Sequence, residues 1–154
     1  MEKESFLEKF VYKIIEKHIA GKTMSSALEI ARGVNSNGIG ATLTFLTDTP
    51  KDRTKANYVV TTYMQLARQM TRFGIRGCIH ISLDQIGGAI SDKMAEENVK
   101  RINKVCITYG IKCWYELKNA DSYKIIFKNL GTEVLIAFDD IDNAVKFVKN
   151  RKLI

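Results

Sequence analysis

Neighbouring strands of the expected sheet could bring together three side chains of the kinds that nucleophilic catalysis uses: His80, Ser82 and Glu116. An imidazole, a hydroxyl and a carboxylate act as base, nucleophile and acid when they lie within hydrogen-bonding reach of one another. Residues 80–88, HISLDQIGG, place a strand end, a polar turn and a glycine pair where enzymes built from strand–helix units keep their active sites. The simpler interpretation of His80 is a buried, hydrogen-bonded histidine. We favour it, so the catalytic residues stay unknown.

Two other kinds of site have weaker support. The histidines His18 and His80 and the cysteines do not show the spacing of metal ligands, so we expect no metal site. Gly87, Gly88 and a helix start at Ser91 could present backbone N–H groups to an anion. They lack the spacing of the phosphate-binding loops, however, and turn glycines are the favoured interpretation.

Length and charge indicate a single domain with a mild preference for acidic partners. The chain has 154 residues and a formal net charge of +7. This length can bury a sufficient core without metals or disulfides, so we expect one domain over residues 1–154. Most lysines alternate with glutamates on expected helices, as on solvated faces. The basic C-terminal tail has one aromatic residue, Phe147, for base stacking, so we do not expect nucleic-acid binding.

The cysteines and the hydropathy pattern bear on location. Cys78, Cys106 and Cys113 form no CxxC pair, and any disulfide scheme leaves one of them unpaired. Reduced thiols in a cytoplasmic protein are the simplest expectation. A leader peptide is not recognisable, and no apolar run approaches the roughly eighteen residues that span a bilayer. We therefore expect a cytoplasmic protein without a membrane span.

The elements that must position these side chains follow from the apolar periodicity. Two helices are expected within residues 1–40, one over 4–20 and one from Thr23 or Ser25 to about 35. Four strand–helix units follow over residues 41–154. The expected strands are 41–47, 75–82, 111–117 and 132–138, and the expected helices are 53–73, one from Ser91 to before Gly110, 122–130 and 140–149.

Strands that alternate with helices predict an α/β fold with a parallel sheet. A flavodoxin-like open sheet and half of an eight-stranded barrel both fit this pattern. One face of the expected strands is consistently polar, with Thr42 and Thr44 on the first strand, His80 and Ser82 on the second, and Trp114 and Glu116 on the third. A polar face suits a barrel lumen better than a sheet covered by helices on both sides.

Three segments resemble the flavin-dependent proline dehydrogenase family, whose catalytic domain is a distorted TIM-like barrel. AGKTMSSALEIARGVNSNGIGATLTFLTD resembles that family's first helix, turn and first strand. IHISLDQIG resembles its second strand and IKCWYEL its third. The resemblance covers about residues 20–154, and it implies a shortened, divergent member with four strand–helix units, half of the barrel.

The family's motifs match this chain unevenly. Gln85 and Gly87 match the family's turn, and Glu116 matches the second acid of its third strand. Ser82 stands where the family has a flavin-facing lysine, and Trp114 stands where it has the first acid. The resemblance thus implies a cofactor-binding set of Ser82, Gln85, Gly87 and Glu116, and a substrate pocket of Thr44, Asp48, His80 and Trp114.

FAD is the cofactor that the resemblance implies. The replacements at Ser82 and Trp114 weaken or remove its binding site. A reduced flavin needs hydrogen-bond donors near N1 and N5, and carboxylate capture needs a guanidinium group. The family's last four strands, which carry further flavin contacts and the substrate-binding arginines, have no counterpart in this sequence. Trp114 at a lumen position also competes for space with the isoalloxazine ring.

These observations leave more than one function and assembly open. The chain is a proline-dehydrogenase-like protein without full proline oxidation on its own, a non-catalytic ligand-binding or regulatory half barrel, or one subunit of a split flavin-dependent oxidoreductase. Activity, if present, would be oxidation of proline or a related imino acid. Because a half barrel exposes unpaired strand edges, we expect a homodimer or a complementary half-barrel subunit. The alternatives are an edge covered by the N-terminal helices and an open, monomeric sheet.

Overall fold

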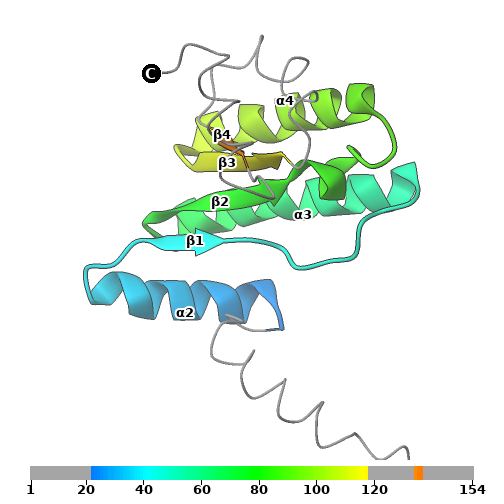
Figure 1. The fold of residues 1–154 in the computed structure, drawn as a ribbon. Coiled ribbons are helices and arrows are strands. Elements are labelled where there is room, and N and C mark those ends of the chain that lie inside the picture. Colours follow the sequence, from blue (N-terminus) through cyan, green and yellow to red (C-terminus); the bar gives the residue numbers. More distant parts are fainter. Residues whose placement is uncertain (1–21, 118–133, 137–154) are drawn as a thin grey trace, which may run out of the picture.

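A computed structural model describes residues 22–117 and 134–136 of the chain. The helices expected over 4–20, 122–130 and 140–149 lie outside the described residues. Within the described part, strands and helices alternate as expected, beginning with a helix (Figure 1).

The three long helices begin and end at residues that the sequence marks. Helix α2, Met24–Ser36, starts with a capping box in which Thr23 and Ser26 each accept a hydrogen bond from the other's backbone N–H. Asp52 caps helix α3, Arg53–Arg72, and Ser91 caps helix α4, Asp92–Tyr109. These ranges confirm the predicted helices to within a few residues.

The strands form one parallel sheet in the order β1-β2-β3-β4. Their bounds are Ala41–Leu43 for β1, Gly77–Ser82 for β2, Lys112–Leu117 for β3 and Val134–Ile136 for β4. The structure confirms a first strand that begins at Ala41, but its predicted end at residue 47 was wrong, because pairing stops after Leu43. Beyond that point the backbone N–H of Phe45 donates to the Tyr63 hydroxyl instead of to a strand, at 3.3 Å.

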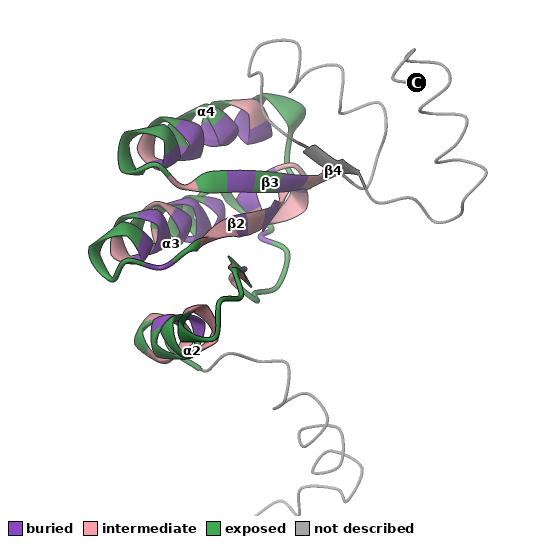
Figure 2. Cartoon of the chain, turned by 90° about the vertical axis from the view of Figure 1, so that its left-hand side faces the viewer, coloured by how far each residue is buried: buried purple, intermediate pink, exposed green. Residues whose placement is uncertain are grey.

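Strand order and helix placement decide between the two expected architectures. The strands follow one another in sequence order, as in a barrel, and the chain does not reverse direction within the sheet. Helices α2, α3 and α4 lie on the same side of the sheet (Figures 1 and 2). A doubly wound sheet has helices on both sides. The fold is therefore α/β, an open parallel sheet of the barrel type.

The core lies between the sheet and helices α2, α3 and α4 (Figure 2). Alternate residues of β2 and β3 point into it, and Ile79, Ile81 and Tyr115 are fully buried there. The next residue along each strand points to the other face. This alternation fixes the register, because a slip by one residue would move polar side chains into the core. At the carboxyl end of β2 the chain continues into the short helix η1, Leu83–Ile86.

Candidate functional site

The sheet face opposite the helices carries polar side chains from three neighbouring strands. We call it the open sheet face, and its residues are Thr42, Cys78, His80, Ser82, Trp114 and Glu116. Strand register sets their spacing, since His80 pairs with Trp114 and Ser82 pairs with Glu116. Thr42 pairs with Cys78, and their side chains are 3.2 Å apart. The structure thus brings together four of the eight residues that the sequence assigned to a site: His80, Ser82, Trp114 and Glu116.

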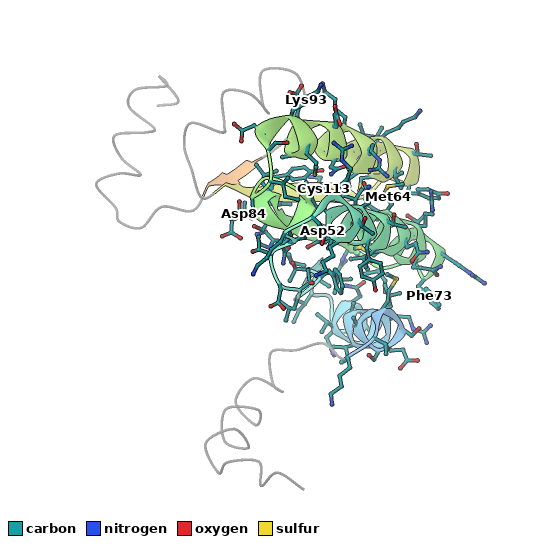
Figure 3. All side chains as sticks on the ribbon, turned by 90° about the vertical axis from the view of Figure 1, so that its right-hand side faces the viewer. Asp52, Met64, Phe73, Asp84, Lys93 and Cys113 are labelled. Carbon is teal, nitrogen blue, oxygen red and sulfur yellow. The ribbon has the colours of Figure 1, made fainter. Side chains whose placement is uncertain are left out.

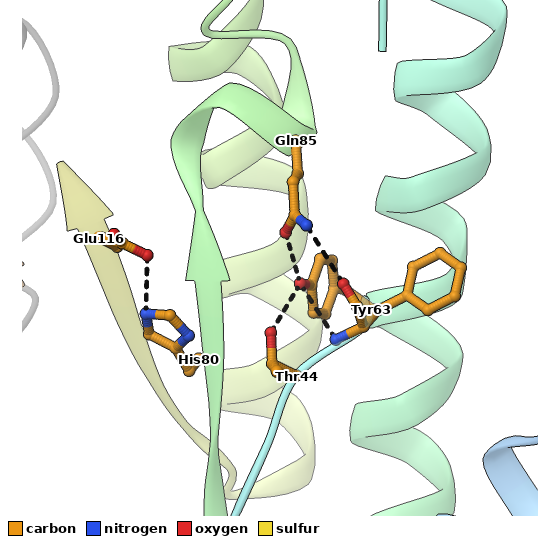
Figure 4. A network of polar contacts seen from close by, with 6 residues as sticks. Thr44, Tyr63, His80, Gln85 and Glu116 are labelled. Carbon is orange, nitrogen blue, oxygen red and sulfur yellow. Dashed lines mark hydrogen bonds and ion pairs between the residues drawn. The ribbon is translucent and has the colours of Figure 1, made fainter. Parts of the chain in front are cut away.

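His80 and Glu116 form the centre of this face (Figure 4). Nε2 of His80 lies 3.4 Å from Oε2 of Glu116, and the two side chains are 26% and 27% exposed. The distance suits an ion pair, but Nε2 of His80 is buried and forms no hydrogen bond within the described part of the chain. A buried polar atom without such a bond costs about 1–3 kcal/mol. The pair is therefore incomplete as it stands.

Trp114 provides an apolar surface next to this pair. Its side chain is on the same face of the sheet as His80, in register on the neighbouring strand, and it is 37% exposed. A large aromatic residue this accessible is uncommon in a strand that otherwise packs well, and it offers an indole ring for stacking or for contact with a cation. The face therefore combines a carboxylate, an imidazole and an aromatic surface.

A second polar cluster lies on the other side of β2 (Figure 4). The hydroxyl of Tyr63 donates to Oε1 of Gln85 at 3.1 Å, and Nε2 of Gln85 donates to the backbone carbonyls of Phe45 and Thr47, each at 3.3 Å. The Tyr63 hydroxyl also lies 3.4 Å from that of Thr44. We call Tyr63 and Gln85 the clamp, because together they fix the segment after β1 to η1 and α3.

Burial shapes the chemistry of the clamp. Tyr63 is fully buried, and this burial raises the pKa of its hydroxyl above the ordinary value, partly offset by the hydrogen bonds from Thr44 and from the N–H of Phe45. The hydroxyl therefore stays protonated and keeps donating to Gln85 over the physiological range. The clamp is a structural element.

Gln85 and Gly87 are two of the predicted cofactor-binding residues. In the structure both have contacts within the fold that the sequence does not reveal. Both polar atoms of the Gln85 side chain are engaged in the clamp. Gly87 is buried with φ 110°, and an added Cβ would lie 2.7 Å from the side chain of Met94. Its role in the fold is thus a left-handed turn packed against α4. Cofactor binding by Ser82, Gln85, Gly87 and Glu116 stays a prediction.

The predicted substrate pocket is brought together in part. His80 and Trp114 are neighbours on the open sheet face, and Thr44 follows β1 on the same side of the molecule as the clamp. Asp48 is exposed on the segment between β1 and α3. The polar contacts of the described residues do not connect Asp48 with His80 or Trp114. Its place in a pocket stays a prediction.

Sequence reasoning missed several polar residues that hold the fold together. Tyr63 is one of them, and Asn98 is another: its side-chain N–H₂ donates to the carbonyl of Ile86 at 2.8 Å and anchors η1 to α4. Asn103 accepts from the buried hydroxyl of Tyr115 at 2.9 Å. One sequence signal could have identified them: each is a polar residue on the apolar stripe of a helix. A buried polar side chain at such a position is stable only when it forms a hydrogen bond.

The described residues give two further results. They contain no group of three or more histidine, cysteine, aspartate or glutamate side chains that could hold a metal ion. None of their helices is long and apolar enough to cross a membrane.

Comparison with known proteins gives structural matches alone. Protein-family models and curated proteins do not match the chain. Its structure is similar to that of proline utilization A (PutA) from Bdellovibrio bacteriovorus inactivated by N-propargylglycine, with a TM-score of 0.67 and 13% sequence identity. It is also similar to the apo form of 3-keto-D-glucoside 4-epimerase, YcjR, from E. coli, with a TM-score of 0.59 and 16% identity.

These matches show the fold and leave the activity open. The chain is covered to 96% by the first match and to 97% by the second, but it spans 21% of the PutA chain and 73% of the epimerase chain. Both neighbours are TIM-like barrel enzymes, in agreement with the strand order found here. At 13% and 16% identity a shared fold does not transfer substrates or residue roles.

Proposed function

We propose that this protein is a proline-dehydrogenase-like half barrel that binds a small polar molecule on its open sheet face. The observation that carries the proposal is the incomplete pair of His80 and Glu116. A ligand group that enters between the two side chains, with a shift of the atoms that bury Nε2, would supply the bond that Nε2 of His80 lacks. The polar groups of the clamp, by contrast, already have hydrogen-bond partners within the fold, so they are not available to a ligand.

The chemistry of the face favours a ligand with a positively charged or hydroxyl donor beside an apolar ring or chain. Glu116 can accept a hydrogen bond from an ammonium or a hydroxyl group. Trp114 can cover the apolar part and attracts a cation to its ring face. Cyclic imino acids and amines have this combination, and so do sugars, whose hydroxyl groups and C–H faces stack on indole rings.

A flavin fits this face poorly. β2 carries no lysine or arginine, and β3 carries one, Lys112, at the amino end far along the strand from Glu116. By the resemblance, Ser82 replaces a flavin-facing lysine and Trp114 replaces an acid, so a reduced flavin would lack a cationic donor and would compete with an indole for space. Gln85, whose amide would be a donor, is held in the clamp. Ligand binding without flavin chemistry is therefore our first proposal.

Flavin-dependent oxidation of proline or a related imino acid is the second candidate. It is favoured by the similarity to PutA, which extends over 96% of this chain. In this case a partner would supply the missing donors, and the chain would be one subunit of a split oxidoreductase.

We also propose that further strands complete the barrel and that a second copy of this chain supplies them. β1 and β4 are the edges of the described sheet, and β1 pairs over three residues, Ala41–Leu43. Unpaired strand edges favour association with another chain. Light scattering on a size-exclusion peak would show a dimer. A monomer at all concentrations tested would contradict this assembly.

A thermal-shift screen of the purified full chain tests the first proposal. The panel contains proline, other cyclic imino acids, cyclic amines without a carboxylate, and monosaccharides. We expect at least one class to raise Tm in the wild type and to do so much less in His80→Leu. The control variant Gln65→Leu, at an exposed position of α3, should respond like the wild type. Equal responses of the two variants would contradict a site at His80.

An absorption spectrum from freshly purified protein separates the two candidates. Flavin bands that travel with the protein on a size-exclusion column would support the second candidate and contradict the first. A colourless protein that still binds a member of the panel would support ligand binding without flavin.

A further inference from the structure

The charged residues of the described chain are segregated between the two ends of the sheet. Seven of the eight described acidic residues lie toward the carboxyl ends of the strands, and they are Asp48, Asp52, Asp84, Asp92, Glu96, Glu97 and Glu116. Figure 3 shows Asp52 and Asp84 at this end and Phe73 at the opposite end of α3. The opposite, amino end of the sheet is therefore left with a surplus of cations.

Four exposed cations and two exposed aromatic rings gather at this amino end. We call them the amino-end patch, and they are Arg68, Arg72, Phe73, Arg76, Tyr109 and Lys112. Phe73 is 46% exposed and Tyr109 is 38% exposed. Three ion pairs join described residues to one another, and none of them includes a residue of the patch: Lys55–Asp52, Lys100–Glu96 and His80–Glu116.

Hydrogen bonds between neighbouring turns make the patch continuous. Thr71, next to Arg72, donates to the carbonyl of Tyr109 at 2.8 Å, which joins the ends of α3 and α4. Arg76 is tied through its backbone to Asn35, with bonds of 2.6 and 2.9 Å. Lys112 begins β3 and pairs with Cys78, two residues beyond Arg76. The rings and cations thus stand on a rigid base.

We propose that the amino-end patch binds single-stranded nucleic acid. Guanidinium groups bind phosphates in a bidentate manner, and exposed aromatic rings stack on unpaired bases. The expectation from the sequence that the chain does not bind nucleic acid rested on alternating charges and on the tail. It did not take account of cations that folding brings together from α3, from the segment before β2 and from β3.

Two other occupants fit the patch less well. A second copy of the chain in a two-fold contact would place the same cations against each other, which is unfavourable. Insertion into an anionic membrane requires an apolar helix face that is free to enter the lipid. Helices α3 and α4 instead pack their apolar faces into the core.

Fluorescence anisotropy with the full chain and a labelled single strand of about 12 nucleotides tests this proposal. Four phosphate contacts predict that log Kd changes with log salt with a slope of about 3 in magnitude, and Arg72→Gln/Arg76→Gln should halve it and weaken binding about tenfold. The matched control Lys51→Gln/Arg53→Gln removes two exposed cations at the other end. It should change Kd by less than about twofold, because these cations lie away from the patch.

The aromatic part of the proposal has its own variant. Phe73→Leu keeps an apolar side chain but removes the stacking face, and we expect about tenfold weaker binding to the single strand with unchanged thermal unfolding. Duplex of the same sequence should bind more weakly, because its bases are already stacked. Absent binding at low salt, equal losses in the two double variants, or binding to phosphatidylserine vesicles without binding to nucleic acid would each overturn the proposal.

Discussion

Two polar clusters flank β2 near its carboxyl end, and they differ in how completely their groups are bonded (Figure 4). In the clamp, the Tyr63 hydroxyl donates to Gln85 and accepts from the N–H of Phe45, and Gln85 donates to two backbone carbonyls after β1. In the other cluster, Nε2 of His80 lies 3.4 Å from Glu116 and has no hydrogen bond among the described residues. The first cluster is complete within the fold, and the second is not.

Residue type alone therefore does not separate structural from functional polar groups. Gln85 lies in the stretch that most resembles a cofactor-binding motif, yet its amide is used by the fold. His80 was expected to be a satisfied buried histidine, yet it carries the unsatisfied atom. A cluster whose groups are all bonded stabilises the fold, whereas an incomplete one retains capacity to bind.

Removing the clamp should give the largest effect. Gln85→Leu deletes three hydrogen bonds and leaves the Tyr63 hydroxyl and two carbonyls without their partner, so we expect a loss of about 3 kcal/mol in the free energy of unfolding. Urea denaturation followed by circular dichroism measures it. Gln65→Leu on the exposed side of α3 is the control and should stay within about 0.5 kcal/mol. Similar values for both variants would show that the clamp is not structural.

Tyr63→Phe should have a smaller effect that depends on pH. It removes the hydroxyl that Gln85 accepts from, at a cost of about 1.5 kcal/mol near neutral pH. Burial raises the pKa of Tyr63 in the folded protein, so above a pH of about 10 the unfolded chain releases a proton that the folded chain keeps. This proton release from the unfolded chain destabilises the folded wild type as the pH rises. The variant has a phenylalanine at position 63, which does not titrate, so it lacks this effect.

The difference in stability between the wild type and Tyr63→Phe should therefore narrow above that pH. Urea denaturation at a series of pH values measures the narrowing. Tyr58→Phe, at a side chain that is 66% exposed, provides the control and should show no such trend. A difference that stays constant into the alkaline range would contradict the assignment of the Tyr63 hydroxyl as a buried donor.

Glu116→Gln tests the other cluster through ligand affinity. If the ligand carries an ammonium group, loss of the carboxylate charge should weaken binding about tenfold, which is about 1.4 kcal/mol. A ligand that binds through a hydroxyl group should be affected much less. Calorimetric titration measures this with the best compound of the thermal-shift panel. Glu97→Gln on the exposed side of α4 is the control. An equal loss of affinity in this control would contradict the assignment of Glu116 to the binding site.

Much of the fold was predictable because it follows from local signals. Thr23, Asp52 and Ser91 cap helices that carry apolar stripes, and Gly110 ends α4 in a left-handed conformation. The length of β1 was not predictable. Residues 41–47 alternate like a strand, and the partner that ends the pairing, Tyr63, is distant in sequence and acts through its side chain.

The shared face of the strand residues was predictable, and their hydrogen bonds were not. Alternation along the strands places His80, Trp114 and Glu116 on one face, and the structure confirms this. Which polar groups find partners depends on distances between elements, which periodicity does not contain. For the same reason the grouping of Arg72, Arg76 and Lys112 at one end of the sheet emerges from the fold and not from the order of charges.

The most direct test of this account is the free energy of unfolding of His80→Leu, measured by urea denaturation beside the wild type and Tyr63→Phe. Because His80 contributes an unsatisfied atom and no hydrogen bond within the described part of the chain, we predict a change within about 0.5 kcal/mol, or a gain in stability. Tyr63→Phe should lose about 1.5 kcal/mol in the same experiment. A loss in His80→Leu as large as in Tyr63→Phe would mean that His80 holds the fold together, and it would contradict the assignment of the open sheet face as a binding site.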